Sequence, residues 1–478
     1  MNFISPSPRN EVLLLPQCLD DFIAQDNPVR FINQFVDSLD LRKCGFAFPK
    51  ENAENRGRPA YHPASLLKLF IYGYKNGVRS GRKLEKSCKV NMEVIWLLQR
   101  LAPDFKTICD FRKINKRAFV QVSAEFVRFC QKLDLVSKKV IAIDGTSIKA
   151  SNNKGKSWSE ATIERKLKQY EKDVEKYLNQ IEEADNTGAQ IPSNLDYKGE
   201  LQQKLENAQK QVEELTALKK ELEDSEKDFL SKTDPDSRSL KKNGKSMVGY
   251  NVQSAVEGKS HLIISAEVTE ETNDLGQLKP TIELVESTIG KLKDSKILAD
   301  KGYYSTQDIK DCEEHSVDLH IPSFAHKNQE NKGLYSKRFF QYDEETNTYT
   351  CPNKQRLPKV STSKRNGKVT LKYRNRKACV QCPLKDKCTQ GKSRTVERWE
   401  DESLLEKIKK NLNAFPEAMK LRGSIVEHPF GTIKEYIMPG GFLVRSREMV
   451  QAELSLAQLA YNFKRVLNLV SFPRIMTV

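Results

Sequence analysis

The sequence predicts an α/β protein in which helices flank a mixed β-sheet, preceded by a helical domain and interrupted by an inserted helical hairpin. Three observations lead to this fold class. Apolar residues recur at helical spacing through about the first 135 residues. Residues 156–232 are charged and have coiled-coil spacing. Short apolar segments typical of strands lie on both sides of that charged stretch.

The composition points to a polyanionic partner. The 478 residues contain 80 Lys and Arg against 64 Asp and Glu, a formal net charge of +16. This excess favours nucleic acid over a membrane, although a merely basic protein is an equal alternative on charge alone. No apolar run approaches the ~18–20 residues of a membrane span. We see no export signal and no disulfide framework, so we expect a cytoplasmic protein.

Residues 1–135 are expected to form a helical DNA-binding domain. In "HPASLLKLFIYGYKNG" the apolar residues from Leu66 to Tyr74 follow one helical face. Compact helices with a basic face are a common form of DNA-docking module, and the alternative is that these charges only solvate amphipathic helices. The basic residues expected to contact DNA include Arg56, Arg58, Arg79, Arg82 and Lys83.

Residues 156–232 are predicted to form a helical hairpin. Apolar residues from Ile163 to Ile181 alternate steps of four and three, and so do those from Leu201 to Leu215. The breaker "NTGAQIPSN" separates the two series. A separate dimerisation coil is the competing interpretation. An inserted hairpin is favoured because strand-like sequence resumes directly afterwards.

Residues 136–155 and 233–345 are predicted to form the sheet. The stretch "KVIAIDGTSIKA" supplies one strand, and "MVGYNVQSAV" and "HLIISAEVT" form a hairpin around the turn "EGKS". A helix within residues 274–292 is followed by the short strands "SKILAD" and "VDLHIPSF". This order of strands and helices is typical of a mixed sheet.

Two aspartates, Asp144 and Asp300, each follow a short apolar strand. Carboxylates at the ends of neighbouring strands repel each other unless a cation neutralises them, and Mg²⁺ suits such oxygen ligands. Two ions about 3.5–4 Å apart are the usual arrangement for attack on a phosphodiester. Glu427 is the candidate for a third acid, and Pro429 suggests that it lies near a helix start. Each acid alone could equally have a structural role, as a loop cap or at a helix terminus.

The segments "AIDGT", "LADKGYYS" and "VEHPFGTIK" resemble the DDE transposases of bacterial insertion sequences, whose catalytic domain has the ribonuclease H-like fold. The stretch "RGRPAYHPASLLKLFIYGYKNGVRSGRKLEKSC" is similar to the helical N-terminal domain of one large group of these enzymes. The stretch "TDPDSR" followed by "VGYNVQSAV" is similar to the segment before their second strand. The resemblance covers most of the chain.

The resemblance implies an enzyme that cleaves the ends of an insertion element and joins the 3′-hydroxyl to target DNA. Asp144, Asp300 and Glu427 match its catalytic triad and would hold two Mg²⁺ or Mn²⁺ ions. Lys434 matches a lysine that contacts DNA near the cut, and Arg422 is expected to contact a phosphate. A homodimer on paired ends and association with the nucleoid also follow. The alternatives are a DNA-binding descendant that no longer cuts, and a metal-dependent nuclease without strand transfer.

Residues 346–400 are predicted to be a basic, cysteine-bearing insert, similar to one seen in this transposase group. A structural zinc ion bound by four thiolates is favoured over free thiols in a basic loop. Residues 401–478 are expected to form the C-terminal helical part of the core, which carries Glu427. Tyr303 and Tyr304, which follow Asp300, either line the site or pack in the core. The four candidate zinc ligands are Cys351, Cys379, Cys382 and Cys388.

Overall fold

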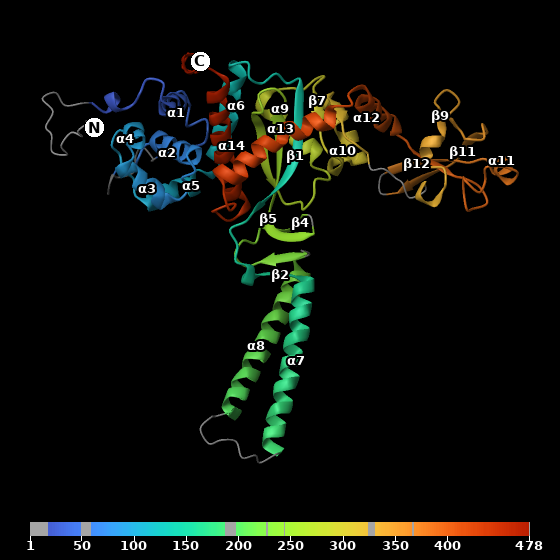
Figure 1. Cartoon of the computed structure of the whole chain (residues 1–478), viewed down its shortest axis with the longest axis horizontal. Helices are drawn as coiled ribbons and strands as arrows, with labels where there is room; N and C mark the ends of the chain where they lie inside the picture. The colour runs from blue at the N-terminus through green and yellow to red at the C-terminus, as the bar shows by residue number, and fades with distance from the viewer. Residues whose placement is uncertain are drawn as a thin grey trace, which may run out of the picture.

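The computed structural model of the chain shows a long molecule with a central sheet, N-terminal helices on one side and a small second sheet on the other (Figure 1). Arg56 and Arg58, which the sequence predicts to contact DNA, lie outside the residues that the structure describes. None of the described helices is long and apolar enough to cross a membrane. The described residues are 18–48, 59–186, 197–225, 228–242, 244–323, 330–365 and 368–477.

The central sheet is mixed, as predicted. Strand β1 pairs antiparallel with β5, which pairs antiparallel with β6, while β7 and β8 continue from the other edge of β1 in parallel. Strand β4 also pairs with β5. This is the strand arrangement of a ribonuclease H-like core. The strands are β1 (Val140–Lys149), β4 (Arg238–Lys242), β5 (Lys245–Glu257), β6 (Ile263–Thr269), β7 (Lys296–Leu298) and β8 (Asp318–His320).

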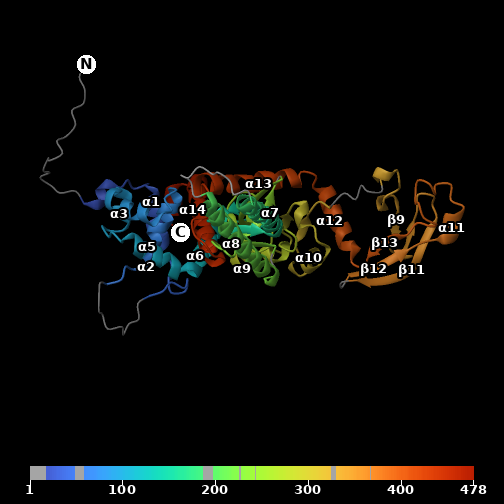
Figure 2. The same cartoon turned by 90° about the horizontal axis from the view of Figure 1, so that it is seen from below.

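Helices cover both faces of this sheet. Helix α9 (Leu278–Ile289) lies across one face, and α13 (Ala418–Thr432) lies across the other, where it contacts β1, β5 and β7 (Figures 1 and 2). Three consecutive residues of β1, from Ile141 to Ile143, are fully buried. Such unbroken burial is expected where both faces of a strand are covered.

The N-terminal helices share one hydrophobic core with the central sheet and the C-terminal helices. The long helix α14 (Arg447–Leu469) packs on α6 and α2, and the rings of Phe126 and Phe463 stack with their centroids 4.2 Å apart. Burial of large aromatic rings is a major source of stability. The helices are α1 (Pro28–Asp37), α2 (Pro63–Lys75), α3 (Gly81–Val90), α4 (Met92–Leu97), α5 (Phe105–Ile114) and α6 (Lys116–Lys132).

The predicted helical hairpin projects from one end of the sheet (Figure 1). Its helices α7 (Glu160–Asn186) and α8 (Tyr197–Asp224) are closed at the base by the paired strands β2 (Ser157–Ser159) and β3 (Phe229–Ser231). Four buried apolar residues form a small core between the helices near that base. They are Ile163, Leu215, Leu218 and Leu222.

A second, five-stranded antiparallel sheet forms the cysteine-bearing insert, with its own small hydrophobic core. Helix α12 (Glu402–Ala414) leads from it back to β8 of the central sheet. The insert comprises β9 (Gln341–Asp343), β10 (Thr348–Thr350), β11 (Arg356–Arg365), β12 (Lys368–Tyr373), α11 (Arg376–Val380) and β13 (Val396–Trp399). The remaining short helices are η1 (Leu19–Phe22), η2 (Lys154–Lys156), η3 (Lys301–Tyr303), α10 (Thr306–Asp311), η4 (Glu313–His315), η5 (Glu330–Lys332), η6 (Lys337–Phe339), the π-helical turn η7 (Ile433–Ile437) and α15 (Phe472–Ile475).

Candidate active site

The register of the sheet brings Asp144 and Asp300 together. Strands β1 and β7 are parallel, and their last pair is Ala142 with Leu298. Each aspartate lies two residues beyond that pair. The prediction that Asp144 ends its strand is wrong, because pairing with β5 carries β1 on to Lys149. The neighbouring strand β7 ends beside Asp144. The Asp144 carboxylate therefore lies where β7 no longer pairs with β1.

The two aspartates concentrate negative charge that Arg422 partly offsets. Arg422 Nη1 lies 3.0 Å from Asp144 Oδ1, and the two side chains are only 18% and 21% exposed. Burial raises the pKa of Asp144, the charge of Arg422 opposes this, and the charge of Asp300 raises that pKa further. The backbone N–H of Gly145 also donates to Asp144 Oδ1 at 3.0 Å. Arg422, predicted to contact a phosphate, therefore pairs with a catalytic candidate in this structure.

Asp300 is held by the turn that follows it. Its Oδ1 accepts a hydrogen bond of 2.7 Å from the backbone N–H of Gly302, at the start of η3. Tyr303, the last residue of η3, is fully buried, and its hydroxyl group donates a hydrogen bond to Gln253 Oε1 on β5. Tyr303 thus has the core-packing role that the sequence left open.

A further carboxylate, Asp274, was missed by the sequence analysis. Burial raises the pKa of Tyr303, and the negative charges of Asp274, Asp144 and Asp300 add to that effect, so all three acids surround this tyrosine. Asp274 lies in the loop between β6 and α9. The signal that could have identified it is the pair "ND" directly before a predicted helix, which sequence analysis ordinarily assigns to capping.

Glu427 lies on α13 but is exposed and does not join the aspartates closely. Among the described residues, no group of three acids that includes it brings ligand atoms within 4.8 Å of one another. The prediction that Glu427 is near a helix start is wrong, because α13 begins at Ala418 and continues through Pro429. Pro429 is buried with Ile425 and Val426, and this packing offsets the loss of one helical hydrogen bond.

Lys434 comes just after the C-terminal end of α13, the helix that carries Arg422 and Glu427, and lies close to Asp144. It belongs to the π-helical turn η7, which continues α13. Its Nζ donates a hydrogen bond to Thr146 Oγ1. Thr146 follows Asp144 by two residues on β1 and therefore points to the same face of the sheet. Arg422 thus pairs with Asp144 itself, and Lys434 bonds to the side chain two residues further along the same strand.

The prediction that Arg79 contacts DNA is wrong. Its side chain is 6% exposed and forms an ion pair of 3.0 Å with Glu453, which is fully buried on α14. The guanidinium also donates to the carbonyl oxygens of Gly441 and Pro439, at 2.8 and 3.0 Å. Charge patterning could not distinguish this buried cation from its exposed neighbours Arg82 and Lys83 on α3.

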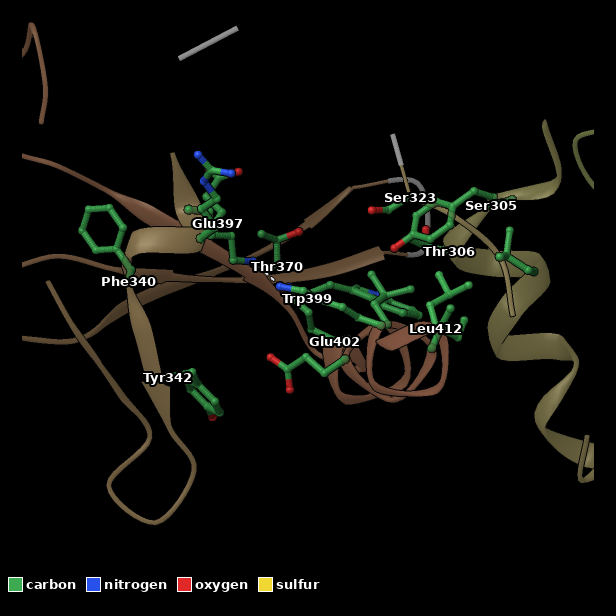
Figure 3. A pocket seen from close by; sticks show the side chains of 18 of the residues that line it. Ser305, Thr306, Ser323, Phe340, Tyr342, Thr370, Glu397, Trp399, Glu402 and Leu412 are labelled. Atoms are coloured by element: carbon green, nitrogen blue, oxygen red, sulfur yellow. Dashed lines mark hydrogen bonds and ion pairs between the residues drawn. The ribbon is translucent and has the colours of Figure 1, made fainter. Parts of the chain in front are cut away.

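A cleft of about 940 Å³ lies between the segment that follows the aspartates and the insert, and neither aspartate lines it (Figure 3). Leu275 and Tyr304, the neighbours of Asp274 and Tyr303, line one end. Aromatic residues of the insert, including Tyr342 and Trp399, line the other. Tyr304 therefore lines this neighbouring cleft, and its role at the aspartates stays a prediction.

The four cysteines of the insert line one small cavity of about 30 Å³. None of the ten cysteines forms a disulfide. Burial raises the pKa of Cys388; nearby Arg394 opposes this, and the other three sulfurs raise the pKa further, which shows that all four are close. Within the part of the chain that the structure describes, no three of these sulfur atoms lie within 4.8 Å of one another.

The aspartates fit a divalent metal ion such as Mg²⁺ or Mn²⁺. They are adjacent, partly buried oxygen donors whose repulsion raises the pKa of Asp144, and a hard cation with oxygen ligands relieves such repulsion. The described residues contain a tighter ligand cluster at Glu283, Glu314 and His315. There, however, Lys279 pairs with Glu314 at 2.6 Å and with Glu283 at 3.7 Å, so that cluster is a surface ion-pair network.

Comparison with protein families gives two matches. Residues 17–114 match the model described as a transposase domain (DUF772), and residues 224–463 match the transposase DDE domain. The mixed sheet, with one aspartate on β1 and one just after the neighbouring parallel strand β7, is of the ribonuclease H-like class. Because the second match covers half of the chain, the chain belongs to the DDE transposase family. No curated protein matched the chain.

Proposed function

We propose that this protein is a DNA transposase that binds the ends of an insertion element, cleaves them by phosphodiester hydrolysis and joins the freed 3′-hydroxyl to target DNA. The observation that carries the proposal is the in-register placement of Asp144 and Asp300 on neighbouring parallel strands. Family membership supports this reaction class, and the excess of 80 basic over 64 acidic residues suits a DNA substrate.

Asp144, Asp300 and Glu427 are the proposed ligands of two divalent ions, Mg²⁺ or Mn²⁺. When bound, such ions activate the attacking oxygen and stabilise the leaving oxygen at a phosphodiester. Asp144 and Asp300 provide a prepared pair of carboxylates. Glu427 is exposed on α13, so its carboxylate is available to close the site when DNA and metal ions bind.

Arg422 and Lys434 are the proposed phosphate contacts. Both lie beside Asp144, through the ion pair of Arg422 and the bond from Lys434 to Thr146. A phosphate placed between these cations would be oriented for in-line attack, which lowers the entropic cost of reaction. Arg422 would exchange its partner from Asp144 to the phosphate when metal ions neutralise the aspartate.

DNA outside the cut site is proposed to contact the N-terminal helices and the insert. Arg82 and Lys83 are exposed on α3, and the insert strands β11 and β12 carry several basic residues. The helical N-terminal part belongs to the transposase-type match. Binding of two ends by a homodimer, and association with the nucleoid in the cytoplasm, complete the proposal.

A structural zinc ion is proposed for the insert. Its hydrophobic core contains five buried residues, and Cys351 and Cys388 pack against that core. A sheet with so small a core ordinarily needs a further cross-link. Four thiolates around one cavity are the ligand set that tetrahedral zinc prefers, and contraction of the sulfur atoms onto an ion would close that cavity.

The reaction products test the function and separate it from its alternatives. Purified protein is mixed with labelled DNA carrying its element's ends, a target plasmid and Mg²⁺, with Asp144→Asn in parallel. We expect metal-dependent joining by the natural protein and none by the variant. Cutting without joining would favour a nuclease. Equal end-binding by both proteins without cutting would favour a protein that only binds DNA.

A further inference from the structure

Asp274 lies against the glycine that closely follows each aspartate of the site, although the three carboxylates do not all lie within 4.8 Å of one another. A Cβ atom on Gly145, the residue after Asp144, would overlap the Asp274 carboxylate. A Cβ atom on Gly302 would lie 3.3 Å from Asp274 Oδ2 and 2.9 Å from Asp300 Oδ1. The missing side chains at these two glycines therefore admit Asp274 into the site, beside each of the two strands that carry the aspartates.

One oxygen of Asp274 is held by hydrogen bonds and the other faces the site. Oδ1 accepts from Gln253 Nε2 at 2.7 Å and from Asn251 Nδ2 at 3.3 Å, both on β5. Gln253 Oε1 in turn accepts from the buried hydroxyl of Tyr303. The described residues provide no hydrogen-bond donor to Oδ2, which is the Asp274 atom nearest to a Cβ position on Gly302.

The negative charge of Asp274 is not needed for this hydrogen-bond chain. An asparagine oxygen would accept the same bonds without the repulsion that a carboxylate suffers beside Asp144 and Asp300. The guanidinium of Arg422 is already paired with Asp144. A divalent cation bound by the aspartates would offset the repulsion, because hard cations favour several oxygen ligands.

We propose that Asp274 is a fourth carboxylate of the divalent-metal site, with Oδ2 interacting with the cation directly or through a coordinated water. Gln253 and Asn251 act as positioning residues that hold this carboxylate toward Asp300. The inference rests on the proposed function, since it assumes the same metal site. It explains why Gly145 and Gly302 follow the two aspartates so closely in the sequence.

Titration with Mn²⁺, followed by electron paramagnetic resonance, tests whether Asp274 contributes to metal binding, independently of catalysis. The full-length protein is compared with Asp274→Asn, which keeps the acceptor for Gln253 but replaces Oδ2 by an amide nitrogen. Outer-shell changes commonly weaken metal binding about 10–100-fold, so we expect at least tenfold weaker Mn²⁺ binding with no loss of melting temperature in the absence of metal. Glu271→Gln, which removes a charge from the same loop three residues away, should bind Mn²⁺ like the natural protein.

Unchanged Mn²⁺ affinity in Asp274→Asn would overturn the inference. Asp274→Glu is the second variant, and partial recovery of affinity relative to Asp274→Asn is expected because it restores the charge. Equal losses in the Glu and Asn variants, together with a lower melting temperature, would indicate a purely structural role and would also overturn it. If Mn²⁺ binding depends on Asp274 but the strand-transfer assay yields no joined product, the proposed function fails while the metal-site inference stands.

Discussion

Two acidic clusters among the residues that the structure describes differ in what neutralises their charge. Glu283, Glu314 and His315 hold their ligand atoms within 4.8 Å, yet Lys279 pairs with both glutamates, and the hydrogen bond to Glu314 raises the pKa of Lys279. Three carboxylates surround Tyr303 at the candidate active site, where Arg422 pairs with Asp144.

The difference teaches that closeness of oxygen atoms is a poor guide to a metal site. Exposed acids can approach one another at small cost when lysines and water screen them. Partly buried acids repel strongly, so a protein that retains them must offset that cost with a cation. The acids beside β1 are partly buried and therefore need such a cation. The tighter cluster is at the surface, where Lys279 already pairs with its glutamates.

The largest expected effect would come from Glu427→Gln. If this exposed residue closes the metal site, its loss should reduce strand transfer about a thousandfold, because a metal ion supplies several kcal/mol of transition-state stabilisation. Glu435→Gln, exposed on the following turn η7, is the matched control and should leave joining unchanged. Equal rates for both variants in the joining assay would remove Glu427 from the site.

The carboxylate of Glu453, both of whose oxygens accept hydrogen bonds, is expected to affect the free energy of unfolding rather than the reaction. Glu453 accepts from Arg79 at 3.0 Å and from the backbone N–H groups of Leu443 and Val444 at 2.9 and 3.2 Å. Arg79→Ala leaves this buried charge without its cation, so the free energy of unfolding should fall by about 3–5 kcal/mol. Urea unfolding measures the loss. Arg82→Ala, three residues further on at the start of α3, should change the unfolding free energy by less than about 0.5 kcal/mol, and an equal loss would contradict the assignment.

The proposed zinc site extends the comparison to ligands other than oxygen. Purified protein should contain one zinc ion per chain, and Cys382→Ser should lose it, because each of four thiolates fills one tetrahedral position. Limited proteolysis should then cut within residues 346–400 while the central sheet stays intact. Cys109→Ser, an exposed thiol of α5, should retain the metal. Zinc content independent of Cys382 would contradict the site.

The smallest expected effect concerns the exposed charges of α3. Arg82→Ala should lower the slope of log affinity for element-end DNA against log salt concentration by about one unit, since one phosphate contact is lost. Fluorescence anisotropy at several salt concentrations measures this slope. Lys172→Ala, exposed on the helical hairpin, is the control with the same change of charge. Identical slopes for both variants would place DNA away from α3.

Local patterns were sufficient to predict the sheet and two of its acids. Short apolar runs before Asp144 and Asp300 identified the strands, whereas the parallel register of β1 and β7 is seen only in the structure. Asp274 escaped because its place depends on contacts across β5 and on two glycines far away in sequence. Arg79 was misassigned because a basic residue in the connection between two helices looks the same in the sequence whether its partner is Glu453 or solvent.

Manganese anomalous scattering from crystals of the full-length protein tests the central claim most directly. Mn²⁺ replaces Mg²⁺ at oxygen sites and can be located by its anomalous signal. The account predicts a peak bound by Asp144 and Asp300 and next to Asp274. A peak confined to Glu283, Glu314 and His315, with none beside β1, would contradict it.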